Sequence, residues 1–119
     1  MSLVTTDEAK TYLRVDSSDE DALIGVLLSS ACRLCADVAR LDEEEWAAVD
    51  AYETDEDGNV AETDTDLYTE TELAGIREVM KAAILYAVAY LFEHREEGDH
   101  HGLVLTLRNI LFAIREGVL

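Results

Sequence analysis

The stretch TETELAGIREVMKAAILYAVAYLFEHREEG, residues Thr69–Gly98, carries the strongest helical signal in the chain. Thr69 and Glu72 have the spacing of a capping box, in which each side chain accepts a hydrogen bond from the other residue's backbone N–H at a helix start. Gly98 is a typical C-terminal stop. Between these ends apolar residues recur at helical spacing, at Leu73, Ile76, Met80, Ala83, Ala87, Val88 and Leu91. The pattern predicts one long helix.

Within this helix the segment Ala82–Phe92 is apolar on every side. A helix of that kind lies at the centre of a domain or is covered by neighbouring subunits. We therefore expect this helix to be central, with surplus apolar surface that serves a subunit interface.

A second long helix is expected before it. Ser17 and Glu20 have capping-box spacing, and acidic residues follow in the first turn, where the helix dipole favours anions. Residues of this face then recur at helical spacing, at Leu23, Leu27, Ser30 or Ala31, Leu34 and Val38. The helix should end near Arg40.

Two shorter helices are expected at the ends of the chain. Thr5 and Glu8 form a further capping box, which predicts a helix over about Thr6–Leu13. Near the C-terminus the apolar spacing predicts a helix over about Leu103–Arg115, stopped by Gly117.

The middle of the chain, about residues 43–68, is rich in acidic side chains. Its opening, EEEWAAVDAYE, could extend a helix or begin a strand, and Asp57-Gly58 is a hairpin turn signal. The expected fold is therefore mainly α. It is a single helical domain over residues 1–119, with two long antiparallel helices, short first and last helices, and an acidic hairpin or loop between the long ones.

The acidic stretch ETDEDGNVAETD, residues Glu53–Asp64, approaches the pattern of an EF-hand calcium loop. Asp55, Asp57 and Asp64 are the candidate ligands. Glu53 stands where the loop needs Asp, however, and Asp64 replaces the longer Glu that binds calcium with both oxygens. We favour a hairpin turn or ordered loop without metal, and a small calcium-binding module remains an alternative.

The charge of the chain is strongly acidic, with 27 acidic and nine basic residues and a formal net charge of −18. Such a chain repels nucleic-acid backbones. It fits a protein adapted to molar salt, where the Debye length is about 3 Å and self-repulsion is screened. It also fits an acidic DNA mimic or other protein-binding inhibitor. The acids are spread along the whole chain, which favours salt adaptation, because a mimic should gather its charge on one face.

Other chemistry is sparse. Cys32 and Cys35 fall within the second expected helix and are interpreted as small half-buried thiols on one face. The sequence shows no glycine-rich phosphate loop and no nucleophile–base set, so we expect no enzyme activity and no cofactor. No apolar run has the length of a membrane span.

The order of these elements is similar to that of a known family. The opening run VTTDEAKTYLRVDSSDEDALI, the long helix after it and the closing AILYAVAYLFEHREE resemble the head–tail connector (adaptor) proteins of tailed bacteriophages, a class linked to DNA packaging. Residues 8–10, 12–16, 19–21, 23 and 24 match the opening pattern, and Phe92–Glu96 stand where the closing run is expected.

The resemblance implies a structural virion protein. Connectors form a homo-oligomeric ring beneath the portal protein, extend the DNA channel and receive a tail-completion protein. They would be found at the head–tail junction of the virion, and in the host cytoplasm during assembly. DNA would pass without sequence-specific binding, and an acidic wall would let it slide. The candidate interface residues are Glu8, Tyr12, Arg14, Asp16, Tyr90, Glu93, Arg95 and Arg115.

Overall fold

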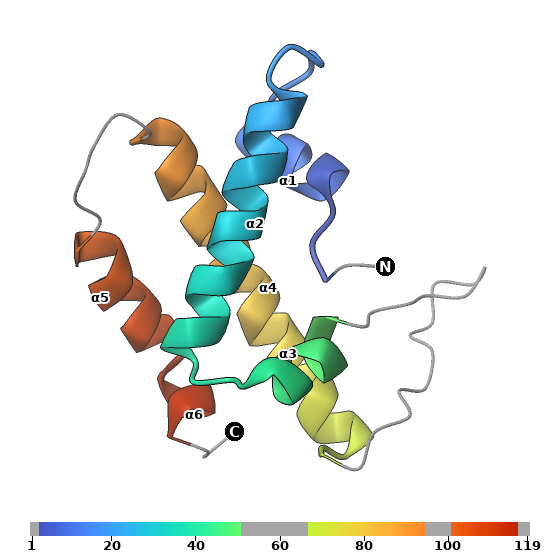
Figure 1. Ribbon diagram of the computed structural model, residues 1–119, viewed down its shortest axis with the longest axis vertical. Helices are drawn as coiled ribbons and strands as arrows, with labels where there is room; N and C mark the ends of the chain where they lie inside the picture. The colour runs from blue at the N-terminus through green and yellow to red at the C-terminus, as the bar shows by residue number, and fades with distance from the viewer. Residues whose placement is uncertain (1–2, 51–66, 95–100, 117–119) are drawn as a thin grey trace.

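Two long helices cross at the centre of the protein (Figure 1). The computed structural model describes residues 3–50, 67–94 and 101–116, and within these ranges all the regular structure is helical. Helices α2 (Asp21–Val38) and α4 (Glu70–Glu93) run in opposite directions and pack against each other. The expected mainly α fold with two long antiparallel helices is confirmed.

Shorter helices surround this pair. Helix α1 (Thr6–Leu13) contacts both long helices on one side, and α5 (His101–Ile110) contacts both on the other side (Figure 1). Helix α3 (Glu43–Asp50) packs on α4, and the single turn α6 (Phe112–Arg115) follows α5.

The core lies where α2, α4 and α5 meet. Small residues of the two long helices, among them Ala31 of α2 and Ala83 and Ala87 of α4, are fully buried. Their size lets the helix axes approach closely. Larger side chains fill the space around them, and those with no exposed surface are Ile24, Met80, Ile84, Val88, Leu103, Leu107 and Leu111.

Helix α4 is central, as its composition predicts. Within Ala82–Phe92 only Ala82 and Tyr86 are exposed, and the other side chains are buried or half-buried. The neighbouring helices of the same chain therefore cover most of the apolar surface that the sequence pattern assigned to a subunit interface.

The capping boxes of α1 and α4 are both formed. The Thr5 N–H donates to Glu8 Oε1 (3.3 Å) while the Glu8 N–H donates to Thr5 Oγ1 (3.1 Å). At the start of α4 the Thr69 N–H donates to Glu72 Oε1 (3.0 Å) and the Glu72 N–H donates to Thr69 Oγ1 (3.2 Å). Two local side-chain interactions thus define where these helices begin.

The capping box expected from Ser17 and Glu20 is wrong. Helix α2 begins at Asp21, with Glu20 at the N-cap position and no side-chain cap bond. The Asp21 N–H donates to the Ser18 carbonyl (3.3 Å) in a turn, and the Asp21 carboxylate pairs with Lys10 Nζ of α1 (2.7 Å). A tertiary ion pair, rather than the local box, accompanies the start of this helix.

The helix ends also differ from expectation. Helix α4 ends at Glu93, where the His94 N–H donates to the Tyr90 carbonyl (2.9 Å). This end lies before Gly98, the expected stop, which is outside the described residues. The expected last helix is divided at Leu111 into α5 and α6. Gly117 is outside the described residues as well.

The acidic middle begins as a helix. The Glu45 N–H donates to Asp42 Oδ1 (2.8 Å) and the Asp42 N–H donates to Glu45 Oε1 (3.2 Å), so α3 has a capping box with Asp in the first position. The expected hairpin turn and the calcium-loop candidates Asp55, Asp57 and Asp64 lie outside the described residues.

Candidate interaction surface

The connection between α1 and α2 is a tight corner. Arg14 closes α1 in the left-handed conformation (φ 60°, ψ 40°), and its N–H donates to the last carbonyls of the helix. The next N–H, that of Val15, donates to the Lys10 carbonyl (2.9 Å). This ending is common for helices but usually uses glycine, since a side chain costs about 1 kcal/mol in that conformation. The Arg14 side chain itself is exposed.

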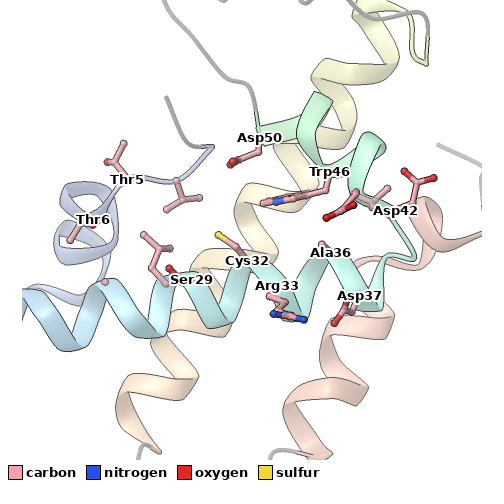
Figure 2. Close-up of a pocket in the computed structure, with 15 residues that line it drawn as sticks. Thr5, Thr6, Ser29, Cys32, Arg33, Ala36, Asp37, Asp42, Trp46 and Asp50 are labelled. Carbon is pink, nitrogen blue, oxygen red and sulfur yellow. The ribbon is translucent and has the colours of Figure 1, made fainter.

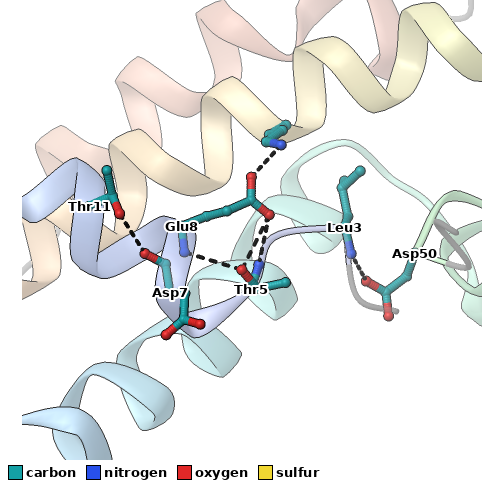
Figure 3. A network of polar contacts seen from close by, with 7 residues as sticks. Leu3, Thr5, Asp7, Glu8, Thr11 and Asp50 are labelled. Carbon is teal, nitrogen blue, oxygen red and sulfur yellow. Dashed lines mark hydrogen bonds and ion pairs between the residues drawn. The ribbon is translucent and has the colours of Figure 1, made fainter. Parts of the chain in front are cut away.

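Glu8 ties α1 to α4 within the chain. Its carboxylate forms an ion pair with Lys81 of α4 in addition to its bonds with Thr5 (Figure 3). Partial burial by itself raises the pKa of Glu8, but the hydrogen bond and charge of Lys81 and the bonds from Thr5 outweigh it, so the pKa lies below the usual value. Glu8 therefore has a structural role between helices.

Tyr12 and Asp16 point away from the core. Tyr12 is 51% exposed although it is a large aromatic residue, and Asp16 is exposed at the corner beyond it. Together with Arg14 they form an exposed group on one end of the molecule. Tyrosine and arginine are enriched at protein-binding surfaces, so this group is a candidate interface.

The candidate interface residues on α4 differ in their exposure to solvent. The Tyr90 ring is half-buried and stacks on the His94 ring, with 4.3 Å between centroids. Tyr86, one turn earlier, is the exposed tyrosine of this helix. Glu93 is exposed, and Arg95 lies outside the described residues.

Arg115 stands apart from these candidates. It is half-buried in α6, at the far end of the molecule from the α1–α2 corner (Figure 1). Tyr12, Arg14 and Asp16 are thus all exposed within one segment at the α1–α2 corner, whereas Tyr90, Glu93 and Arg115 lie elsewhere.

Arg77 is an important residue that the sequence reasoning missed. It is 6% exposed, and its guanidinium donates to the carbonyls of Val49 (3.1 Å) and Ala48 (3.1 Å) at the end of α3. A cation at a helix C-terminus also interacts favourably with the helix dipole. The sequence did carry a signal that Arg77 is buried, because Arg77 lies between Leu73 and Met80 on the apolar stripe of the helix.

Two further polar contacts hold α3. The Tyr68 hydroxyl donates to Glu45 Oε2 (2.9 Å), and the Leu3 N–H donates to Asp50 Oδ1 (3.0 Å; Figure 3). Burial, together with the bond to Glu45 and neighbouring carboxylates, raises the pKa of Tyr68 to about 12.

A groove of about 760 Å³ runs between the N-terminal segment, α2 and α3 (Figure 2). Its lining is mixed, with Trp46 beside several carboxylates and hydroxyls, and Cys32 faces it. Burial, with the charge of Asp50, raises the pKa of Cys32 to about 11, and burial raises that of Cys35 to about 12. Both thiols are therefore protonated and weakly nucleophilic at neutral pH. They lie on α2 as half-buried and buried side chains.

Residues 3–50, 67–94 and 101–116 contain neither a metal-binding cluster nor a membrane-spanning helix. No group of three or more His, Cys, Asp or Glu side chains in these ranges is arranged to hold a metal ion. None of the helices there combines the length and the apolar character that crossing a membrane requires.

Comparisons with models of protein families, with curated proteins and with solved structures found no match to this chain.

Proposed function

We propose that this chain is a head–tail connector, a structural virion protein that joins the portal to the tail and extends the DNA channel as a homo-oligomeric ring. The observation that supports this function is the placement of the opening run. Its residues form one continuous unit of α1, the left-handed corner and the start of α2, and this unit presents Tyr12, Arg14 and Asp16 to solvent. Its apolar members Ala9 and Ile24 are fully buried.

The proposed partners are further copies of the chain, the portal protein and a tail-completion protein. The protein would act at the head–tail junction of the virion, after assembly in the host cytoplasm, and it would carry out no catalysis. Exposed carboxylates are found on four of the helices, at Asp7, Asp37, Glu44, Glu78 and Glu93. A channel wall of this kind repels the DNA backbone, so DNA slides past it without sequence-specific binding.

Adaptation to high salt is part of the proposal. The chain has two lysines, and Lys10 and Lys81 are both paired with carboxylates, Asp21 and Glu8. The exposed surface is then dominated by carboxylates, whose mutual repulsion is screened in concentrated salt. The free energy of unfolding should rise steeply from dilute buffer to molar potassium chloride. Equal stability at both ends of this range would remove the case for a salt-loving host.

The decisive test is assembly on a portal ring. The gene should lie directly after portal and capsid genes, and the portal encoded there supplies the probe. Purified chain, mixed with that portal in high salt, should add a ring that is visible by negative-stain electron microscopy. Tyr12→Glu should weaken this assembly, while Val26→Glu, at a 64% exposed apolar position of α2, is the matched control. A chain that neither self-associates nor binds the portal would overturn the proposal.

An acidic DNA mimic that inhibits a DNA-binding protein is the second candidate. The observation in its favour is the acidic region around the connection of α2 and α3, where Asp37 at the end of α2, Asp42 in the connection, and Glu43 and Glu44 at the start of α3 are all exposed. Such a protein would act as a monomer and would compete with DNA for a basic partner. Sedimentation therefore separates the two candidates, because only the connector should form large assemblies.

A further inference from the structure

Helix α5 and the turn α6 have apolar residues on both sides. On the inner side Leu103, Leu107 and Leu111 are fully buried against the long helices. A second stripe at helical spacing faces outward, and we call it the α5–α6 outer face; its residues, all exposed, are His101, Leu105, Arg108, Asn109 and Phe112. Leu105 is 46% exposed and Phe112 is 58% exposed.

The charge of this face is opposite to that of the protein. The stretch His101–Arg115 contains two arginines and no acidic residue, in a chain with 27 acids. Arg108 is exposed between Leu105 and Phe112 and forms no ion pair with any described residue. An apolar pair with an arginine between them has the composition of an interface core, because aromatic residues and arginine are enriched there.

The α1–α2 corner is complementary to it. Asp16 and Asp19 are exposed in the same segment as Tyr12, and we call these three residues the acidic corner. The two carboxylates outnumber the one exposed guanidinium of that segment, Arg14. Carboxylates of the corner can pair with Arg108, and the tyrosine ring can cover the exposed leucine and phenylalanine. The outer face and the corner therefore match in both charge and apolar character.

We propose that the α5–α6 outer face binds the acidic corner of a second copy of this chain, an inference that rests on the connector function proposed above. The corner lies at the top of the view in Figure 1, beyond the start of α2, whereas α5 and α6 lie at the left and lower left, so the two surfaces are in different parts of the molecule. A contact between two different faces is head-to-tail, so it leaves one free face at each end of every dimer. Repetition with a constant rotation closes such a chain of contacts into a ring.

The repulsion between two strongly acidic chains opposes this contact in dilute buffer. At high salt the long-range repulsion is screened, while ion pairs within a desolvated interface are screened much less. The contact should therefore form in concentrated salt, and all variants must be compared at one salt concentration.

The test reverses charges by substitution and measures self-association of the full-length chain by sedimentation in molar potassium chloride. Arg108→Glu should raise the concentration needed for half-maximal association by about tenfold or more, since close interfacial charge pairs contribute at least this much. Arg33→Glu is the matched control, because Arg33 is an exposed arginine on α2 with no ion pair to a described residue, and it should associate like the native chain. Circular dichroism checks that each variant keeps its helix content.

A second pair of measurements identifies what binds the α5–α6 outer face. The double substitution Asp16→Arg with Asp19→Arg should weaken association as Arg108→Glu does. An equimolar mixture of this variant with Arg108→Glu should assemble again, because one contact in the mixture is native and the other has exchanged charges. Leu105→Ser should weaken assembly without changing charge.

Three results would overturn the inference. If Arg108→Glu and Arg33→Glu associate equally, the outer face is not the contact, although the connector function stands if the native chain still assembles. If the mixture fails to assemble, the outer face binds something other than the acidic corner. If the native chain remains monomeric at every concentration but binds the portal, the outer face does not bind a second copy, and the connector function again survives.

Discussion

Helices α4 and α3 pack against each other, yet different forces hold them. Helix α4 is fixed by apolar burial along its length, with Met80, Ile84 and Val88 all fully buried. Helix α3 buries only Ala48 and Val49. Its position depends on directional polar contacts with groups elsewhere in the chain, at Arg77, Tyr68 and the Leu3 N–H.

This difference predicts different responses to perturbation. Apolar burial is non-directional and shared by many neighbours, so no single polar group controls the position of α4. Each polar contact of α3 can be broken separately by one substitution or one change of protonation. Helix α3 should therefore loosen under conditions in which α4 remains folded.

The largest effect should come from the core of α4. Ile84→Ala removes a fully buried side chain and leaves a cavity, so the free energy of unfolding should fall by about 2–5 kcal/mol. Tyr86→Ala, at the 38% exposed position of the same helix, is the control and should cost about 1 kcal/mol or less. Urea unfolding followed by circular dichroism gives both values. Equal costs would contradict the burial of α4.

Arg77→Met should produce the next largest effect, and it should be local. The new side chain has a similar length but cannot donate to the Ala48 and Val49 carbonyls, so the loss should be about 1.5–3 kcal/mol. Amide exchange should accelerate in α3 while the central amides of α4 keep their protection. Arg33→Met, at an exposed position of α2, serves as the control. Uniform acceleration across both helices would argue against a separate α3.

Tyr68→Phe should have a smaller effect that depends on pH. It removes the hydroxyl bond to Glu45 and should cost about 1 kcal/mol at neutral pH. Because folding raises the pKa of Tyr68 from its usual 10 to about 12, the contribution of the hydroxyl is complete below pH 10 and is lost as the pH rises through about 12. The stabilities of the native and Phe chains should therefore converge in strong alkali. A constant difference across that range would refute the assignment.

Glu8→Gln should have the smallest effect. The ion pair with Lys81 is more than a third exposed, so its loss should cost up to about 1 kcal/mol at neutral pH. The pKa of Glu8 is lowered by folding, so its contribution is present above the usual value of 4.5 and is lost as the pH falls through the folded value. Acid also relieves the general repulsion of the chain, and only the difference between native and Gln chains isolates this residue. That difference should shrink in acid.

Much of the helical framework could be predicted because its signals are local. The starts of α1 and α4 follow from Thr and Glu residues three positions apart, which satisfy each other's backbone whatever surrounds them. The central position of α4 follows from its composition, since a helix that is apolar on all sides must be covered. The interpretation of the two cysteines as half-buried thiols holds for Cys32, whereas Cys35 is fully buried.

The tertiary structure decided what the spacing left open. Ser17 and Glu20 have the residue types and the spacing of a capping box. Lys10 nevertheless pairs with Asp21, and α2 begins after the expected box. Tyr86 and Tyr90 are both tyrosines one turn apart, and only the packing of neighbouring helices makes one exposed and the other half-buried.

The same holds for the contacts that join distant parts of the chain. Glu8 pairs with Lys81, and the Arg77 guanidinium binds the end of α3. In both cases the partners are far apart in the sequence, so no helical spacing could have predicted the contact. By itself the sequence determined that the two long segments and the two terminal ones are helical and that α4 is central, because those properties depend on interactions within one or two turns; it left α3 open between helix and strand. Only the folded arrangement of the helices determined which side chains meet, because such contacts depend on how the helices pack against one another in three dimensions.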